Sequence, residues 1–260
     1  MSDQRKKVLA LNSSPRPQGL SRTRLMLDHL VQGMEQAGAQ VETVHLAKKK
    51  IKYCTGCYHC WFKSPGMCIQ QDDMTRELYP KWLATDIVVY ATPLYNDSMN
   101  ALLKTFVERT IPSYLPTFVW ENGRTNHPAR SGFPAIVLLS VAGMPEMANF
   151  DLMSAHARFH FQKEGKRLLA EIYRPAAETY ADPSRRQLWA DILDAVRQAG
   201  QELVEQEAVS PATLARIGQP VGDPEMLCGR INKIMQICQD RGITPTELGK
   251  EIAARKKRSQ

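Results

Sequence analysis

The sequence has no apolar run long enough to cross a membrane, which needs roughly 20 residues. Its longest candidate, residues 135–143, is interrupted by Ser140. The N-terminus offers only four consecutive apolar residues, Val8 to Leu11, and the core of a secretory signal is longer. We therefore expect a cytoplasmic protein that does not enter or contact a membrane.

Hydrolytic motifs are missing as well. We find no Ser/His/Asp order in a credible setting, no H-E-x-x-H and no pair of carboxylates suited to acid–base work. Asp72 and Asp73 are better interpreted as the acidic cap of a following helix. The charge balance, 34 Lys and Arg against 27 Asp and Glu, is basic, but the basic residues fall in short separate runs without interleaved aromatics. This pattern does not predict nucleic-acid binding.

What is present first is an alternation of strand and helix signals. With 260 residues, 43% of them apolar, the chain can bury a core without disulfides. Continuous apolar strands separated by helices indicate a parallel sheet covered on both faces. We therefore predict an α/β fold with a doubly wound, five-stranded parallel sheet. The expected strands are 7–11, 40–46, 86–91, 135–139 and 168–173, and the expected helices are 21–37, 73–84, 98–110 and 145–164.

The last third of the chain changes character, because no strong strand signal follows Pro175. Four helix starts repeat one design, a capping side chain followed by proline at the first helical position. We predict two parts, an α/β domain over residues 1–175 and a helical extension over 176–260 that packs on the domain or at a dimer interface. The four starts are Asp182-Pro183, Ser210-Pro211, Asp223-Pro224 and Thr244-Pro245.

The segment from Asn12 to Thr23, which we call the phosphate loop, lies between the first strand and the first helix. An open parallel sheet binds anions there, at the positive end of the helix. Arg16 can add a charge-assisted bond. The loop lacks the Walker A and G-x-G-x-x-G patterns, so a mononucleotide such as FMN suits it best. The alternative is an ordinary turn with Ser21 as a helix cap. The hydroxyls that could contact a phosphate are those of Ser14, Ser21 and Thr23.

Two further loops should face the same ligand. In a flavodoxin-like sheet of order 2-1-3-4-5 the ligand crevice opens between strands 1 and 3. The segment after the third strand offers a rigid proline and an aromatic face for a flat ring, although Tyr95 alone could be a half-buried strand-end tyrosine. The segment after the fourth strand is small, as close backbone approach requires. The candidate ring-binding residues are Pro93, Leu94, Tyr95, Asn96, Ser140, Val141, Ala142 and Gly143.

Four of the six cysteines, Cys54, Cys57, Cys60 and Cys68, lie in an insertion over residues 48–72, which we call the cysteine segment. Such crowding in a reducing compartment indicates metal or redox chemistry. Four thiolates could hold a 4Fe–4S cluster, with the lysines of residues 48–52 offsetting its charge. Zinc bound by four cysteines, or by three with His59, is a second interpretation, and free thiols without metal are a third.

The chain resembles the flavodoxin-like NAD(P)H-dependent FMN reductase family, in the branch that includes the iron–sulfur flavoproteins. The resemblance covers roughly residues 7–175. Ser13 stands where the family usually has glycine. The residues that carry it are Ser14-Pro15-Arg16 with Gly19, Thr92-Pro93-Leu94-Tyr95 with Ser98-Met99 and Lys104, and the four cysteines with Asp72-Asp73-Met74.

The resemblance implies an oxidoreductase that binds FMN, accepts a hydride from NAD(P)H and passes electrons to a small-molecule or protein acceptor, for example ferredoxin. The cysteine segment would supply a 4Fe–4S cluster, and no side chain is expected to be catalytic itself because the chemistry belongs to the flavin. A homodimer or a dimer of dimers is expected. A second class of protein remains open, an electron-transfer flavoprotein without a substrate of its own. Such a protein would not consume NAD(P)H.

Overall fold

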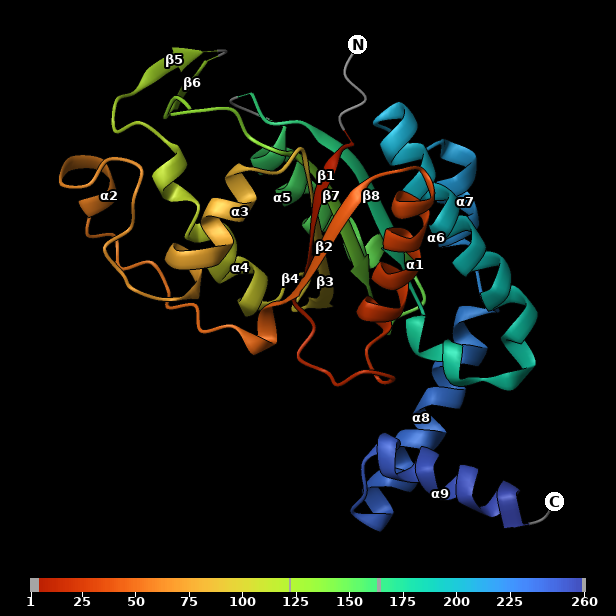
Figure 1. The fold of residues 1–260 in the computed structure, drawn as a ribbon. Helices are drawn as coiled ribbons and strands as arrows, with labels where there is room; N and C mark the ends of the chain where they lie inside the picture. The colour runs from red at the N-terminus through yellow and green to blue at the C-terminus, as the bar shows by residue number, and fades with distance from the viewer. Residues whose placement is uncertain (1–4, 122, 163–164, 259–260) are drawn as a thin grey trace. The chain divides into compact units, whose positions relative to one another are not determined.

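The computed structural model describes residues 5–121, 123–162 and 165–258. Its central feature is a parallel sheet of five strands in the order β2-β1-β3-β7-β8, which is the flavodoxin-like order and confirms the predicted fold class (Figure 1). The strands are β1 (Lys7–Asn12), β2 (Gln40–His45), β3 (Ile87–Tyr95), β7 (Ala135–Val141) and β8 (Leu168–Arg174); β4 (Ser98–Met99) pairs antiparallel with β3, and β5 (Val119–Glu121) pairs with β6 (Arg124–Asn126).

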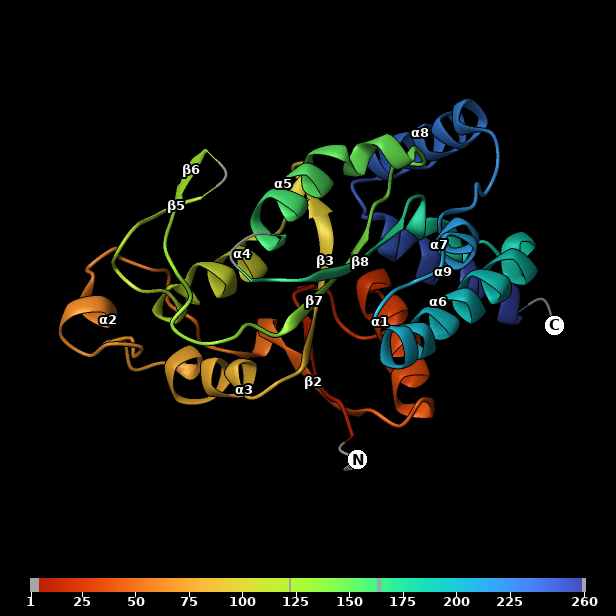
Figure 2. The same ribbon diagram turned by 90° about the horizontal axis from the view of Figure 1, so that it is seen from above.

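Helices cover both faces of the sheet, as the continuous apolar strands require. One face carries α1 and α6, and the other carries α3, α4 and α5 (Figure 2). On the second face a single apolar core joins these three helices to β1, β3 and β7. The helices are α1 (Arg22–Gln36), α2 (His59–Phe62), α3 (Tyr79–Leu83), α4 (Ala101–Glu108), α5 (Asp151–Phe161), α6 (Arg186–Gln206), α7 (Pro211–Gly218), α8 (Pro224–Arg241) and α9 (Pro245–Arg258).

Helices α1 and α6 pack backbone against backbone at two glycines. A Cβ atom at Gly33 would lie 1.8 Å from the carbonyl oxygen of Arg197, and one at Gly200 would lie 2.1 Å from that of Leu30. Only hydrogen fits at either position. Because of this contact, residues 5–219 form one compact unit, and the predicted boundary at residue 175 falls inside it.

Arg174, the last residue of β8, fastens α7 to the sheet. Its guanidinium is fully buried and donates to the carbonyl oxygens of Ile217 (2.7 Å) and Gln219 (2.8 Å), at the negative end of that helix. Burial lowers the pKa of Arg174 to about 10. The centre of the Trp189 ring lies 5.3 Å from the guanidinium carbon, within the range of a cation–π contact.

The predicted helix caps of the last third are confirmed. Ser210 and Asp223 each accept the backbone N–H three residues on, at α7 and α8. Thr244 and Glu247 form the reciprocal capping box that starts α9. At Asp182 the cap is present, but it starts a short 3₁₀ turn that leads into α6. Residues 220–258 form a separate helical unit, in which α8 packs against α9.

Candidate functional site

The phosphate loop connects the carboxyl end of β1 to the amino end of α1. Ser14, Ser21 and Thr23 are all buried there. The Ser21 hydroxyl accepts the backbone N–H of Arg24 at 3.1 Å, so the helix-cap interpretation is correct for this residue. The Ser14 hydroxyl accepts the N–H of Arg16 at 3.4 Å. Both hydroxyls therefore shape the loop that precedes the helix terminus.

Arg16 ends in solvent, about half-exposed, and makes an ion pair with Glu178, which follows β8. Glu178 also lies 3.6 Å from Nε of Arg22, the first residue of α1. The hydrogen bond that Arg16 donates to Glu178 raises the pKa of Arg16. The Glu178 carboxylate therefore lies between two arginines, one in the phosphate loop and one at the start of α1. The sequence did not predict this contact.

Two asparagines that sequence reasoning missed hold the loop in place. Asn12 accepts the N–H of Ser14 at 2.9 Å. Asn100 caps α4 by accepting the N–H of Leu103 and donates to the carbonyl oxygen of Ser13 at 2.7 Å. The Ser13 hydroxyl in turn donates to the carbonyl oxygen of Ala91 in β3. The loop is thus tied to the β3–β4 region across the sheet. The available signal was an asparagine at a strand end and one at a helix start.

The segment after the third strand is not the loop we expected. β3 continues to Tyr95 and returns through β4, with Asn96 and Asp97 both at left-handed φ values of 47° and 58°. Such a two-residue hairpin matches the twist of its strands. Pro93 and Leu94 are consequently buried in the strand, while Tyr95 is 44% exposed and Asn96 is exposed. Tyr95 and Asn96 are therefore the side chains available to a ligand.

At the end of β7, Ser140, Val141 and Ala142 are buried and Gly143 is exposed. Ala142 is bound on both sides, donating to the Arg174 carbonyl and accepting from Ala177. The buried hydroxyl of Ser140 has no hydrogen-bond partner among the described residues. The buried hydroxyls of Ser14, Ser21 and Thr23, at the N-terminus of α1, form a donor set that fits a phosphate group.

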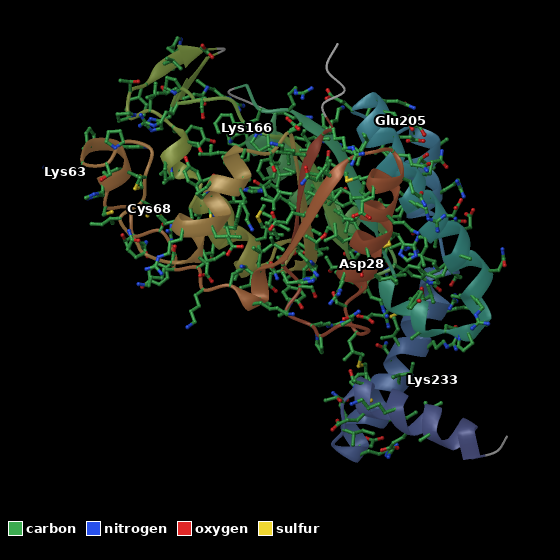
Figure 3. The ribbon with its side chains drawn as sticks, viewed as in Figure 1. Asp28, Lys63, Cys68, Lys166, Glu205 and Lys233 are labelled. Carbon is green, nitrogen blue, oxygen red and sulfur yellow. The ribbon has the colours of Figure 1, made fainter. Side chains whose placement is uncertain are left out.

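The cysteine segment forms the second site. It projects beside α3 and α4, and Cys68 lies within it near Lys63 (Figure 3). The thiols differ in exposure: Cys60 is buried, Cys57 is exposed, and Cys54 and Cys68 are intermediate. Gly56 and Gly66 adopt φ values of +64° and +83°, which fold the segment back on itself. All four cysteines line one pocket, together with Arg109, Ile111 and Pro112.

The surroundings of the thiols shift their pKa values in opposite directions. The backbone N–H of His59 lowers the pKa of Cys57. Burial, followed by the neighbouring Cys68 and Cys54 thiols, raises the pKa of Cys60. In the part of the chain that the structure describes, no three His, Cys, Asp or Glu side chains gather in a way that could hold a single metal ion. Four thiols spread around one pocket fit a multi-iron group, which takes one thiolate per iron.

A buried ion pair holds the ends of the cysteine segment. Arg109, at the end of α4, donates to both carboxylate oxygens of Asp72 at 2.6 and 3.1 Å, and both side chains are at most 2% exposed. Asp72 also accepts the N–H of Lys52 and that of Thr75, which confirms its predicted role at the start of the following helix. Sequence reasoning found Asp72 but missed Arg109.

The lysines predicted to face the thiols are placed differently. Lys49 makes an ion pair with Glu77 at 2.6 Å. The cation that reaches a cysteine is Arg109, whose Nη2 lies 3.4 Å from Sγ of Cys68. The arginine is buried beneath the segment, whereas a lysine run on an exposed strand end is solvated.

Residues 6–153 match the NADPH-dependent FMN reductase family, which is more than half of the chain. The chain belongs to this family. The resemblance predicted from the sequence is thereby confirmed.

The curated relatives that match this chain are named iron-sulfur flavoproteins. An iron-sulfur flavoprotein of Archaeoglobus fulgidus is 36% identical over 141 residues, covering 54% of this chain and 57% of the relative. An iron-sulfur flavoprotein of Methanocaldococcus jannaschii is 34% identical over 103 residues, covering 40% of this chain and 50% of the relative. The chain thus matches about half the length of these relatives.

Solved structures agree on the fold. An azoreductase of Bacillus anthracis aligns with a TM-score of 0.58 at 16% identity, covering 76% of this chain and 99% of its own. An NAD(P)H:quinone oxidoreductase of Methanothermobacter marburgensis aligns with a TM-score of 0.56 at 18% identity, covering 77% and 98%. Among the described residues, no helix combines the length and apolar character that crossing a bilayer demands.

Proposed function

We propose that this chain is an FMN-dependent oxidoreductase that uses NAD(P)H as donor and holds a 4Fe–4S cluster on its four clustered cysteines. One observation carries the proposal: a phosphate loop of the FMN reductase family and a pocket lined by four thiols occur in one compact unit. Either site alone would fit a simpler protein, a reductase without iron or a thiol-rich binding module.

The phosphate loop would hold the phosphate of the flavin. Ser14, Ser21 and the first backbone N–H groups of α1 supply neutral donors, and Arg16 supplies the charge. Asn100 keeps these donors fixed by its bond to the Ser13 carbonyl. Tyr95, Asn96 and Gly143 are the exposed members of the predicted ring-binding set and would face the flavin ring. When bound, FMN accepts two electrons as a hydride and can return them singly.

The cysteine segment would hold the cluster as a one-electron store. Its four thiols would each ligate one iron, and the buried Arg109 would offset part of the negative charge. The acceptor that receives the electrons would be a small oxidant or an acidic redox protein of the ferredoxin kind. The net charge of +7 favours the anionic pyridine nucleotide as donor and, as acceptor, the acidic protein. The assembly would be a homodimer or a dimer of dimers.

The experiment is anaerobic purification followed by iron, zinc and flavin analysis and a visible spectrum. We expect one FMN and about four irons per chain. Cys57→Ser and Cys60→Ser should lose the iron and keep the flavin. Cys228→Ser is the matched control, because it removes an exposed thiol outside the cysteine segment. Zinc, or flavin without iron, would contradict the cluster.

Oxidation of NADH and NADPH separates the enzyme from a pure electron carrier. The proposed oxidoreductase consumes one of the two nucleotides with an artificial acceptor such as ferricyanide. Protein that holds FMN and iron but leaves both nucleotides unchanged would be the electron-transfer flavoprotein, and the proposed reaction would be wrong.

A further inference from the structure

Arg109 has more contacts than an ion pair needs. Besides Asp72, its guanidinium donates to the carbonyl oxygen of Lys52 at 2.6 Å and to the Thr75 hydroxyl at 3.0 Å. Lys52 lies near the start of the cysteine segment and Thr75 follows it, so one side chain closes the loop between Lys52 and Asp72, which are 20 positions apart. The fixed, planar fork of arginine is what allows one group to serve several acceptors.

The same guanidinium is also directed at the thiols. Its Nη2 donates to Sγ of Cys68 at 3.4 Å, within the range of a bond to sulfur, and Arg109 lines the pocket that the four cysteines share. Its Nε is buried and has no partner among the described residues. A buried cation with a donor to spare, facing a pocket of thiols, is placed to compensate negative charge there.

We propose that Arg109 is a positioning residue for the iron–sulfur centre: it holds Cys68 as the fourth ligand and, through its N–H bond to that sulfur, raises the reduction potential of the cluster. The inference rests on the proposed cluster. Hydrogen bonds to cluster sulfurs and nearby positive charge stabilise the reduced, more negative form. Arg109 therefore makes the cluster easier to reduce, without touching the flavin.

The test is a potentiometric titration of the cluster, followed by EPR, in wild type and in Arg109→Lys. The lysine keeps the charge but loses the fork, so it can satisfy Asp72 or Cys68, not both together. We expect the ratio of reduced to oxidised cluster at a fixed potential to fall about tenfold, which is about 59 mV for one electron. Arg130→Lys is the matched control, because Arg130 donates to the carbonyls of Pro112 and Tyr114 in the same region.

A second variant covers the case in which Arg109→Lys fails to fold. The double variant Arg109→Gln with Asp72→Asn removes both buried charges, so neither charge remains buried without its partner. Flavin content and the thermal unfolding midpoint report the fold of each variant. With the fold kept, a lowered potential, or iron lost while flavin is retained, supports the positioning role.

An intact cluster with an unchanged potential in both Arg109 variants would overturn the inference and leave the proposed function standing. An equal shift in Arg130→Lys would also overturn it, because the effect would then be a general one of the region. Wild type that takes up no iron would instead refute the proposed cluster and, with it, the role of Arg109. The two failures are therefore distinguishable.

Discussion

The molecule uses the same chemical pair, an arginine with a carboxylate, in two opposite settings. At the phosphate loop, Arg16 and Glu178 are 51% and 50% exposed. At the cysteine segment, Arg109 and Asp72 are 1% and 2% exposed. An exposed pair contributes little to stability because water and salt screen it. A buried pair cannot lose one partner without leaving the other charge unsolvated.

The difference separates an exchangeable contact from a fixed one. Glu178 can be displaced from Arg16 by a phosphate at little cost, so the pair is suited to a site that must open for its ligand. Arg109 and Asp72 have no such freedom, and they also hold Lys52, Thr75 and Cys68. We therefore expect the first pair to serve binding, whereas the second belongs to the architecture of the cysteine segment.

The largest expected effect is on the buried pair. Asp72→Ala should lower the free energy of unfolding by about 3–5 kcal/mol, because Arg109 would remain buried without its counter-charge. Glu178→Ala, the control from the exposed pair, should lower it by at most about 1 kcal/mol. Urea unfolding followed by circular dichroism measures both. Equal losses of unfolding free energy in the two variants would contradict the difference between the buried and the exposed pair.

The buried pair should also make the free energy of unfolding depend on pH. Burial acts to raise the pKa of Asp72, but the bonds from Arg109 and from the N–H groups of Lys52 and Thr75 outweigh it, so the pKa is lowered overall. A lowered folded-state pKa stabilises the fold above the unfolded value, about 3.9 for Asp, and this contribution is lost as pH falls below it.

Unfolding measured at several pH values between 5 and 2 checks this dependence. The wild type should lose up to about 1.4 kcal/mol more per pH unit than Asp72→Asn, which has no proton to take up at this position. Other carboxylates titrate in both proteins and cancel in the difference. Parallel curves for the two proteins would show that Asp72 titrates normally.

At the exposed pair the effect should appear in binding. Arg16→Ala should weaken FMN binding about tenfold, the low end for a bond to a charged group, because the side chain is half-exposed. Flavin fluorescence quenching measures the affinity. Arg167→Ala, from another exposed pair with Glu207, is the control and should bind FMN like wild type. Indistinguishable affinities in the two variants would remove Arg16 from the site.

The smallest expected effect has the opposite sign. Glu178→Gln should strengthen FMN binding about fivefold, since removing one negative charge about 4 Å from a phosphate saves about 1 kcal/mol in water. Glu207→Gln, at the carboxylate of the exposed pair with Arg167, provides the matched control. Weaker binding in Glu178→Gln would mean that the carboxylate supports the ligand instead of competing with it.

The sequence predicted what is local in the chain. Strand periodicity located the parallel sheet, and cap chemistry located Ser210, Asp223 and Thr244 at helix starts. The hairpin at Asn96 and Asp97 was missed although its signal was present, because an Asn-Asp dipeptide between apolar residues is typical of a tight turn.

What the sequence could not predict depends on distant partners. Arg109 lies 37 residues from Asp72, and Arg16 lies 162 residues from Glu178. A single arginine at the end of an amphipathic helix is ordinarily a solvated residue, so nothing in its neighbourhood marks it as buried. Likewise Gly33 and Gly200 stand inside helices without any local pattern, and only the packing of α1 on α6 explains them.

That close approach of α1 and α6 has a consequence for any shortened form of the protein. The phosphate loop leads into α1. The outer side of α1 is covered by α6, which lies more than 150 residues further along the chain. A truncation at residue 175 would strip that cover and expose Leu30 and Met34, which are fully buried. The fragment would self-associate through this apolar stripe before it could capture a nucleotide.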